Sequence, residues 1–285
     1  MSATQAVLVT GASTGIGRTI VEQLAAEGNR VFAAVRDLSD ATTHPLVTPV
    51  RLDVTSANEA LHAASTVRES LLGMPLRGIV NNAGVAVGGP LEFVELDELR
   101  RQLEVNVVGQ LAVTQAFLPL LRDSGVPDPR IVFMGSISSR IALPLLGPYA
   151  ISKFGVRAMA EALRRELRGW GFKVSVVEPG VVATPIWDKG MADIDASEAT
   201  MPPHARTLYR PFTTATRKAM TSGPDVGMPP SKVADVVSKA LFDKRPRAEY
   251  VVGADAKMGS AVSAVLPTAV MDRLIDSGFR RRADG

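Results

Sequence analysis

The chain has 285 residues, of which 46% are hydrophobic and 21% charged, and its 32 basic and 29 acidic residues give a formal net charge of +3. It contains no cysteine, which excludes disulfides, thiolate metal sites and a cysteine nucleophile. The dense basic run Arg280-Arg281-Arg282 is too short for a nucleic-acid-binding surface. We therefore expect a soluble globular protein with one large core or two modest ones, no nucleic-acid partner and no metal site.

The N-terminal sequence MSATQAVLVTGAS lacks the basic region and long apolar run that mark a secretory signal peptide. No uninterrupted apolar stretch in the chain approaches the roughly 20 residues that span a bilayer. We therefore expect a cytoplasmic protein without a membrane span.

Short β-branched apolar runs alternate with longer amphipathic segments along the chain. The apolar spacing predicts helices over 15–28 and 55–73, both of which end at a glycine. This alternation predicts an α/β fold, a doubly wound parallel sheet with helices on both faces. The runs typical of strands buried on both faces cover residues 6–10, 30–35, 78–82, 130–135, 173–178 and 249–253.

No repeat, low-complexity linker or shift in composition marks a second domain, so residues 1–285 are predicted to form a single domain. Residues 185–230 differ from the rest, because Pro, Met, Trp, His and Tyr are scattered there without a clear period. We expect this segment to be irregular and to act as a substrate-binding lid. Residues 254–285 are expected to form a C-terminal extension.

The first predicted strand leads into the sequence TGASTGIG, residues 10–17. Gly11, Gly15 and Gly17 allow a sharp turn and a close approach of the backbone to a pyrophosphate, whose charge then lies at a helix N-terminus. Similar glycine patterns occur in ordinary tight turns. Because a strand is predicted before this turn and a helix after it, we interpret it as a dinucleotide-binding turn.

Tyr149 and Lys153 are four residues apart in the sequence GPYAISKFGV. On a helix they share a face, with Cβ atoms roughly 5–6 Å apart, so that the phenol and the ammonium can act together. A half-buried tyrosine beside a solvated lysine would give the same spacing. The pair is therefore a candidate site that depends on its surroundings.

Several ordered motifs together make the chain resemble the short-chain dehydrogenase/reductase family. The resemblance is spread over residues 10–184 and continues more loosely through 245–257 into a tail like that of retinol and hydroxysteroid dehydrogenases. It implies a Rossmann-type fold and an NADP-dependent oxidoreductase that interconverts an alcohol with a ketone or aldehyde. The motifs are Thr10-Gly11-x3-Gly15-x-Gly17, Asn81-Asn82-Ala83-Gly84, Asn106 in VNVVG, Ser136 thirteen residues before Tyr149, Tyr149-x3-Lys153, and Pro179-Gly180-x3-Thr184.

The resemblance implies a role for each of four catalytic residues. Tyr149 would be the general acid/base, and Lys153, together with an oxidised nicotinamide, would lower the pKa of the tyrosine and hold the nicotinamide ribose. Ser136 would hydrogen-bond the substrate oxygen, although Ser138 competes for this role. Asn106 would hold a water that links Lys153 to solvent, the alternative being a buried asparagine that is satisfied locally.

The resemblance also implies a set of cofactor contacts, most of them through the backbone. In this set Asp53 would face the adenine ring, and Val182 and Thr184 would meet the nicotinamide end. The full set is Gly11, Ser13, Thr14, Gly15, Ile16, Gly17, Arg36, Asp53, Val54, Asn82, Ala83, Gly84, Tyr149, Lys153, Pro179, Gly180, Val182 and Thr184.

Two rules disagree about which nicotinamide cofactor binds. The general dinucleotide rule counts about 20 residues past the glycine-rich turn to Asp37, which implies NAD. The family's register counts seven residues from Gly28 to Val35, where an acid would stand, and then reaches Arg36, where NADP-using members place a base. Because valine cannot repel a 2′-phosphate and a guanidinium can bind it, NADP is favoured, while Asp37 keeps NAD open.

Three classes of function are compatible with these motifs. An active carbonyl reductase or alcohol dehydrogenase is favoured because all four catalytic residues are present. A non-catalytic NADP-binding module would be expected to have lost Tyr149 or Lys153. A sugar-nucleotide epimerase or dehydratase shares the Tyr-x3-Lys pair but usually has another glycine spacing and a larger C-terminal domain.

The sequence does not name the substrate, the direction of the reaction or the oligomeric state. The family usually pairs the helix that contains Tyr149, so we expect a homodimer or homotetramer. An apolar pocket and a bulky hydrophobic alcohol or ketone are expected, unless the same residues only cover the core or a subunit contact. Those residues are Trp187, Met191, Met201, Leu208, Tyr209 and Phe212.

Overall fold

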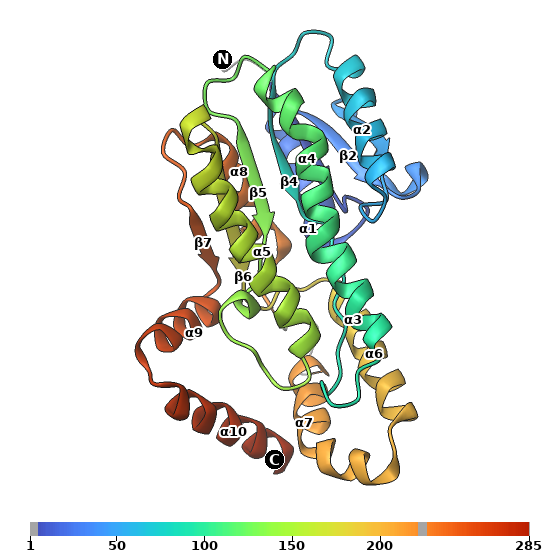
Figure 1. Cartoon of the computed structure of the whole chain (residues 1–285), viewed down its shortest axis with the longest axis vertical. Helices are drawn as coiled ribbons and strands as arrows, with labels where there is room; N and C mark the ends of the chain where they lie inside the picture. Colours follow the sequence, from blue (N-terminus) through green and yellow to red (C-terminus); the bar gives the residue numbers. More distant parts are fainter. Residues whose placement is uncertain (1–4, 222–226, 285) are drawn as a thin grey trace.

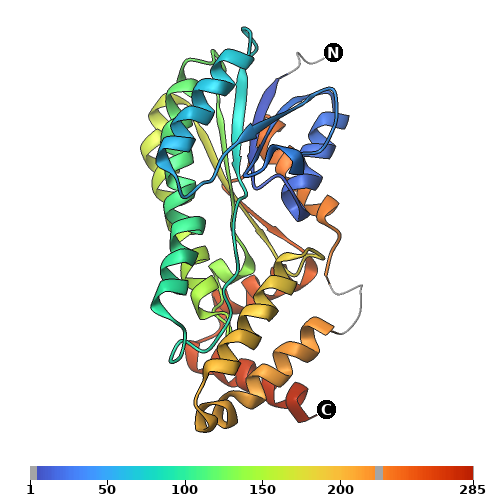
Figure 2. The same ribbon diagram turned by 90° about the vertical axis from the view of Figure 1, so that its right-hand side faces the viewer.

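The computed structural model describes residues 5–221 and 227–284 of the chain. In this part of the chain seven parallel strands form one sheet in the order β3-β2-β1-β4-β5-β6-β7, with helices on both of its faces (Figure 1, Figure 2). The Rossmann-type doubly wound architecture predicted from the sequence is confirmed. The strands are β1 (Ala6–Thr10), β2 (Arg30–Val35), β3 (Val47–Arg51), β4 (Leu76–Asn81), β5 (Arg130–Met134), β6 (Lys173–Pro179) and β7 (Glu249–Val252).

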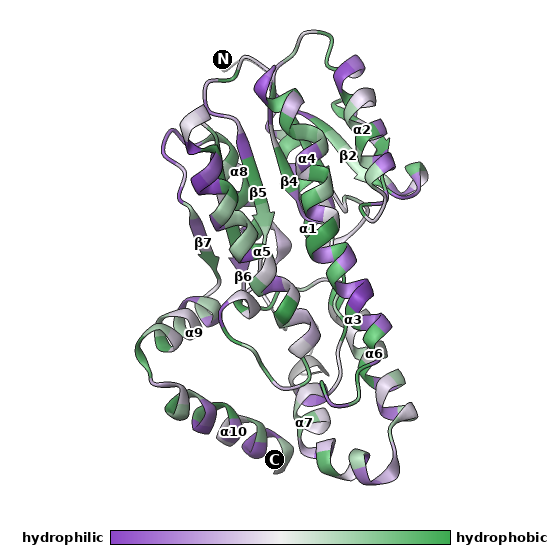
Figure 3. Cartoon of the chain, viewed as in Figure 1, coloured by the Kyte–Doolittle hydropathy of each residue, from purple (hydrophilic) through white to green (hydrophobic). Residues whose placement is uncertain are grey.

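Two hydrophobic cores lie on opposite faces of the sheet, because successive residues of each buried strand point to opposite faces. In β1, Leu8 packs toward α2, α4 and α5, whereas Val7 and Val9 pack toward α1 and α8. Figure 3 shows β4 and most of β5 as hydrophobic. The helices are α1 (Gly15–Ala26), α2 (Ala57–Ser70), α3 (Leu96–Leu103), α4 (Gly109–Arg122), α5 (Gly147–Glu166), α6 (Ile186–Thr200), α7 (Pro203–Thr221), α8 (Pro230–Phe242), α9 (Ala254–Val265) and α10 (Thr268–Asp284).

The edge strand β3 was missing from the sequence prediction. Its sequence VTPVR contains a proline and buries Val50 alone among its five residues. A proline cannot donate to a sheet ladder and is tolerated where one side of the strand is unpaired. An edge strand therefore need not show the continuous apolar run by which the other six were predicted.

The segment 185–230 is not irregular, as was expected from its scattered composition. It folds into α6 and α7, which lie beyond the carboxyl ends of the strands (Figure 2). Much of their surface is exposed, with Leu208 64% accessible, and Pro211 lies inside α7. Residues 222–226 of the expected lid lie outside the described residues. The division into one domain, a lid and a C-terminal extension stays a prediction.

The helices α3 and α4 are joined by a π-helical turn, Glu104–Val108, into one run from Leu96 to Arg122. By length and mean hydropathy this run would suffice to cross a membrane, and 44% of its apolar window is buried inside the fold. Its residues Val113 and Phe117 pack in the core against the sheet, as in the central helices of many globular proteins.

Candidate active site

The expected cofactor turn is locked to the loop that follows β4. The hydroxyl of Thr10 accepts hydrogen bonds from the backbone N–H groups of Asn82 and Ala83, each at 3.0 Å. In return the Asn82 side-chain amide donates to the carbonyls of Thr10 (2.9 Å) and Gly11 (3.1 Å). These bonds hold together the ends of two adjacent strands at the carboxyl edge of the sheet, where ligands of doubly wound folds bind.

The glycine-rich turn has the backbone conformation that a pyrophosphate site requires. Gly11 and Gly15 have φ values of +63° and +55°, and a Cβ atom on Gly11 would lie 2.7 Å from the Cα of Ala83. At the N-terminus of α1 the Thr14 side chain makes no capping hydrogen bond, and the first turn contains no acidic residue. The helix therefore presents uncapped N–H groups, and these residues fit a bound dinucleotide pyrophosphate.

Ser136, Tyr149 and Lys153 lie together and are almost fully buried, with exposed fractions of 6%, 6% and 4%. Ser136 follows β5 and begins a short 3-10 turn, in which its hydroxyl accepts a hydrogen bond from the N–H of Ser138. Tyr149 and Lys153 stand on α5, and the ammonium lies 5.5 Å from the centre of the tyrosine ring. The Lys153 Nζ donates to the carbonyl of Met134, at the end of β5, at 2.8 Å.

Burial has opposite effects on the two ionisable groups of α5. It raises the pKa of Tyr149 to about 12, against the effect of a hydrogen bond with Ser136, which lowers it. It lowers the pKa of Lys153 to about 8. Burial therefore dominates the pKa of Tyr149 in the protein alone, and the expectation that Lys153 together with an oxidised nicotinamide lowers this pKa stays a prediction.

A stripe of four fully buried polar residues on α3, the π turn and α4 holds the chain that follows β4. Gln102 accepts a hydrogen bond from the N–H of Val87 at 2.6 Å, and Asn106 accepts one from the N–H of Val85 at 2.8 Å. Gln110 donates to the carbonyl of Ala83 at 3.1 Å. Thr114 accepts a hydrogen bond from the side chain of Asn81 at 2.9 Å.

The spacing of these polar residues along the helix matches the spacing of their partners along the extended segment after β4. Four residues of α-helix rise about 6 Å, and two residues of extended chain rise about 6.6 Å. A polar residue at every fourth helical position therefore meets every second residue of the extended segment. The sequence analysis identified Asn106 alone, although Gln102, Gln110 and Thr114 follow the same four-residue spacing.

The side chain of Asn106 also reaches the catalytic helix. Its amide donates to the carbonyl of Val85 at 2.9 Å and to the hydroxyl of Ser152 at 3.0 Å, and Ser152 donates to the carbonyl of Tyr149 at 2.7 Å. Asn106 therefore fixes the start of α5 relative to the β4 loop. Its expected role in holding a water stays a prediction.

The residues expected to distinguish NAD from NADP lie at the end of β2 and directly after it. Val35 ends the strand and is 3% exposed, Arg36 is exposed, and Asp37 caps a short 3-10 helix (Leu38–Asp40). One carboxylate oxygen of Asp37 accepts from both the N–H and the hydroxyl of Ser39, at 2.9 and 2.7 Å. Asp37 therefore already has a local structural partner, whereas Arg36 makes no ion pair with any residue that the structure describes.

The remaining expected cofactor residues gather at the same edge of the sheet. Asp53 follows β3 and caps its own turn by accepting from Thr55, which lowers the pKa of its carboxyl. Val54 is buried, and Thr184 lies over the glycine-rich turn, 3.3 Å from a Cβ atom built on Gly15. The others follow β1, β4 or β6 and include Ser13, Ile16, Gly17, Gly84, Pro179, Gly180 and Val182.

The loop after β6 has a second support that the sequence analysis missed. The carboxylate of Asp255, at the start of α9, accepts from the N–H of Val181 at 2.9 Å. Met228 pairs with the same loop through the backbone of Val181 and Ala183. The C-terminal extension thus holds the loop expected to meet the nicotinamide, a contact that short-range sequence spacing cannot reveal.

The helix α7 makes aromatic contacts with the loop after β4 and with α10. Tyr209 donates a hydrogen bond to Glu92 at 2.8 Å, and its ring meets Phe93 edge-on at 5.9 Å. Phe212 links Tyr209 to Phe279 of α10, at 6.3 and 5.6 Å between ring centres. Of the other expected pocket residues, Met201 is buried, Leu208 is largely exposed, and the side chain of Trp187 is outside the described part of the structure.

With this geometry in place, comparison with known proteins identifies the family. The family model described as short chain dehydrogenase matches residues 5–195. This chain belongs to the short-chain dehydrogenase/reductase family. It is therefore an oxidoreductase, and the resemblance inferred from its motifs is confirmed.

The relatives extend over nearly the whole chain. The 3-amino-tetrahydro-pyrrolizinone reductase of Xenorhabdus hominickii is 35% identical over 95% of each protein. The NADPH-dependent 3-dehydrocapnine reductase of Ornithobacterium rhinotracheale is 34% identical over 96% of this chain and 97% of the relative. Human retinol dehydrogenase 5 is 33% identical over 94% of this chain and 87% of that protein, which confirms the resemblance to retinol dehydrogenases.

Solved structures agree with the fold. A short chain dehydrogenase from Burkholderia cenocepacia J2315, in complex with NADP, is 27% identical and superposes with a TM-score of 0.73 over 95% of this chain and 97% of that one. A short chain dehydrogenase/reductase from Burkholderia phymatum, in complex with NAD, is 22% identical with a TM-score of 0.75 over 91% and 92%, and shows the fold alone.

Proposed function

We propose that the protein is an NADP(H)-dependent oxidoreductase that interconverts a bulky apolar alcohol with its ketone or aldehyde. The observation that carries this proposal is the buried group of Ser136, Tyr149 and Lys153 beside an uncapped glycine-rich turn. A non-catalytic NADP-binding module is the alternative, but cofactor binding alone does not require a buried lysine next to a buried phenol.

In the direction of reduction, Tyr149 donates its phenolic proton to the substrate oxygen. Its pKa near 12 keeps the phenol protonated at neutral pH, which suits a proton donor. Ser136 donates a hydrogen bond to the same oxygen as negative charge develops there. Lys153 would hold the nicotinamide ribose, and the bound cofactor would supply the hydride.

The proposal of NADP rests on the surroundings of three consecutive residues. Val35 offers no negative charge to repel a 2′-phosphate, and Arg36 is exposed at the end of β2. Asp37, the residue that would favour NAD, is engaged with Ser39. The names of the NADPH-dependent relative and of the NADP complex support the same choice.

The proposal of an apolar substrate rests on α6 and α7, which bring Met201, Tyr209 and Phe212 to the carboxyl end of the sheet. These helices would act as a lid over the site. We also propose a cytoplasmic homodimer or homotetramer that pairs through α5 and α4. Three apolar side chains support this face, because Val108, Ile151 and Phe154 are 49%, 44% and 44% exposed.

The decisive experiment measures NADPH oxidation at 340 nm with a panel of carbonyl compounds. The panel contains all-trans-retinal, a 3-ketosteroid, a medium-chain aliphatic ketone and pyruvate, each tested with NADPH and with NADH. We expect turnover of the bulky apolar carbonyls with NADPH. Preference for pyruvate would contradict the substrate class, preference for NADH would contradict the cofactor, and tight NADPH binding without turnover of any carbonyl would favour the non-catalytic module.

A further inference from the structure

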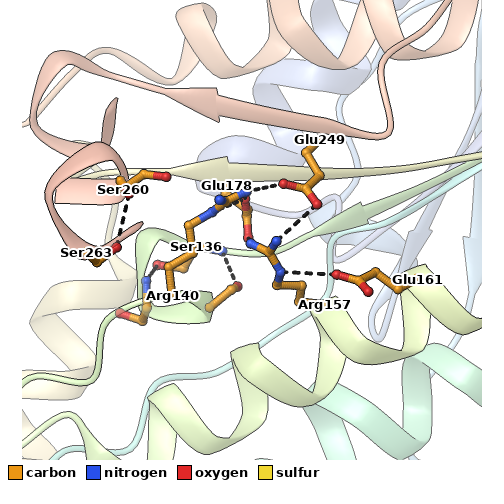
Figure 4. Close-up of polar contacts among 10 residues, drawn as sticks. Ser136, Arg140, Arg157, Glu161, Glu178, Glu249, Ser260 and Ser263 are labelled. Carbon is orange, nitrogen blue, oxygen red and sulfur yellow. Dashed lines mark hydrogen bonds and ion pairs between the residues drawn. The ribbon is translucent and has the colours of Figure 1, made fainter. Parts of the chain in front are cut away.

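Four charged side chains form a closed ring behind the catalytic residues (Figure 4). The guanidinium of Arg140 donates to Glu178 at 2.7 Å and also contacts Glu249. The guanidinium of Arg157 contacts the same two carboxylates, Glu178 at 3.2 Å and Glu249 at 3.0 Å. The ring therefore alternates in sign and contains two positive and two negative charges.

The residues of the ring differ in how far their side chains are buried. Glu178 of β6 has a fully buried side chain, whereas the side chain of Glu249, on the edge strand β7, is 33% exposed. The register pairs Glu178 with Val251, so Glu178 and Glu249 project from the same face, which α5 covers. A buried carboxylate without partners would be strongly destabilising, and here both oxygens of Glu178 are bound by arginines.

Three of the four ring members lie next to a part of the candidate active site. Arg140 directly follows the 3-10 turn of Ser136, and Arg157 lies one helical turn beyond Lys153 on α5. Glu178 directly precedes Pro179 and Gly180. Three elements that carry site residues are therefore joined by charge-assisted hydrogen bonds, which are stronger than neutral ones.

Glu178 also packs directly beneath the serine turn. A Cβ atom placed on Gly135, the residue before Ser136, would lie 3.0 Å from the Cγ atom of Glu178 and 3.0 Å from the hydroxyl of Ser139. The turn itself is only three residues long and is held internally by its own serine hydrogen bonds. Its position relative to α5 depends on contacts outside the turn.

We propose that the ring of Arg140, Glu178, Arg157 and Glu249 positions the Ser136 turn against Tyr149 and Lys153, and so sets the geometry of proton donation. This inference rests on the proposed function. The four are positioning residues, because none of them reaches the reacting atoms. A misplacement of about 1 Å in such a site can lower the rate about 10²-fold.

The test compares Arg140→Gln with Glu161→Gln as the matched control. Glu161 contacts Arg157 at 3.4 Å from outside the ring, so its loss leaves all four ring contacts in place. With all-trans-retinal, or the panel carbonyl that wild type reduces fastest, we expect Arg140→Gln to lower kcat about 10- to 100-fold with KM for NADPH within about 2-fold. Arg140→Lys should recover part of the loss, and the control should match wild type.

A second variant covers the case in which Arg140→Gln does not fold. Glu249→Gln removes one charge at the exposed rim and keeps a hydrogen-bond acceptor, so we expect a folded enzyme with kcat lowered about 3- to 10-fold. A merely structural role predicts a lower Tm with unchanged kcat at temperatures where the variants are folded. That outcome would overturn the proposal.

Amide hydrogen exchange tests the ring without any substrate. We expect faster exchange in residues 135–141 of Arg140→Gln and Glu249→Gln, with the amides of β1 unchanged. Equal exchange in that segment would overturn the ring proposal even if wild type reduces no carbonyl. Absence of turnover in wild type, by contrast, would overturn the proposed function and leave the exchange result to decide the ring.

Discussion

The catalytic wall and the helical cover of this enzyme are stabilised in different ways. The catalytic wall, formed by the carboxyl ends of β1, β4, β5 and β6 with α4 and α5, holds its polar groups buried and bonded to backbone. The helical cover, formed by α6, α7 and α10, has buried residues such as Ile194 and Ala205 in α6 and α7, whereas no residue of α10 up to residue 283 is buried. In the proposed function, the chemistry takes place on the catalytic wall and the substrate contacts the helical cover.

The contrast between the catalytic wall and the helical cover bears on the motion of the cover as well as on substrate specificity. A segment with few buried contacts needs a small free energy for local opening, and this applies here to α10. The aromatic contacts of Tyr209 and Phe212 link α7 to the loop after β4 and to α10, so they hold these segments together. Four predictions test this contrast.

The largest expected effect falls on the catalytic wall. Tyr149→Phe removes the proton donor and keeps the ring, so we expect turnover to fall about 10²-fold or more while NADPH affinity changes little. Steady-state kinetics and NADPH fluorescence titration measure the two quantities. Tyr250→Phe, a tyrosine distant from the site, is the control, and near-normal turnover of Tyr149→Phe would refute the assigned role.

The buried lysine should make stability depend on pH. Because the pKa of Lys153 is about 8 when folded and 10.5 when unfolded, the unfolded chain binds more protons between these values. Stability therefore rises as pH increases from about 8 to 10.5, by ~3 kcal/mol at 1.36 kcal/mol per pKa unit, and this gain is lost as pH falls from 10.5 to about 8.

Urea unfolding at pH 7.5 and 10 measures this rise in wild type and in Lys153→Met. The rise should be absent from Lys153→Met and present in Lys173→Met, which removes an exposed lysine. An equal pH dependence in wild type and Lys153→Met would show that the lysine is not desolvated.

The third prediction concerns Val35 and Arg36 at the end of β2, where the cofactor is expected to bind. Arg36→Leu should weaken NADPH by roughly 1.5–3 kcal/mol, the range for hydrogen bonds to a charged group, and leave NADH nearly unchanged. Adding Val35→Asp should reverse the preference, because a carboxylate repels the 2′-phosphate and accepts from a 2′-hydroxyl. KM and kcat for both cofactors decide the matter, with Arg51→Leu as control. If Asp37→Ala, not Arg36→Leu, changes the discrimination, Asp37 is the ribose partner.

The smallest effect is expected in the helical cover. Phe279→Ala removes the contact between α10 and Phe212, so we expect KM for a bulky ketone to rise about 3-fold, near the lower limit for an aromatic pair. KM for NADPH should stay constant. Leu274→Ala on the same helix, where the side chain is 49% exposed, is the control. A change in NADPH affinity instead would mean that α10 supports the wall.

The sequence predicted the parts of the site that depend on local backbone or fixed spacing. Gly11 and Gly15 have the positive φ values that their turn requires, and Ser136 lies beside Tyr149 as its thirteen-residue spacing implied. The rise in the pKa of Tyr149 was not predicted, because it arises from burial by distant segments. The contact of Asp255 was missed for the same reason, because its partner Val181 is 74 residues away in the sequence.

Three other omissions have different causes. The helices α6 and α7 were not predicted because their prolines and scattered polar residues were taken to indicate an irregular segment, although α7 is amphipathic. The strand β3 was not predicted because an edge strand can contain proline. Gln102 and Gln110 were detectable in principle from the spacing that they share with Asn106. Polar periodicity in an apolar helix is therefore as informative as the apolar periodicity that guided the assignment of elements.

The π turn at Glu104–Val108 makes the contacts of the polar stripe, from Gln102 to Thr114, sensitive to the number of residues in the helix. Each residue of an α-helix advances the side chain by about 100°, so a strict four-residue repeat drifts by about 40° per step around a regular helix. The wider turn around Asn106 offsets this drift between Gln102 and Gln110. Deleting one residue there would convert it to an ordinary turn and rotate Gln102 away from Val87, so the stripe depends on the length of this segment as well as on the side chain of Asn106.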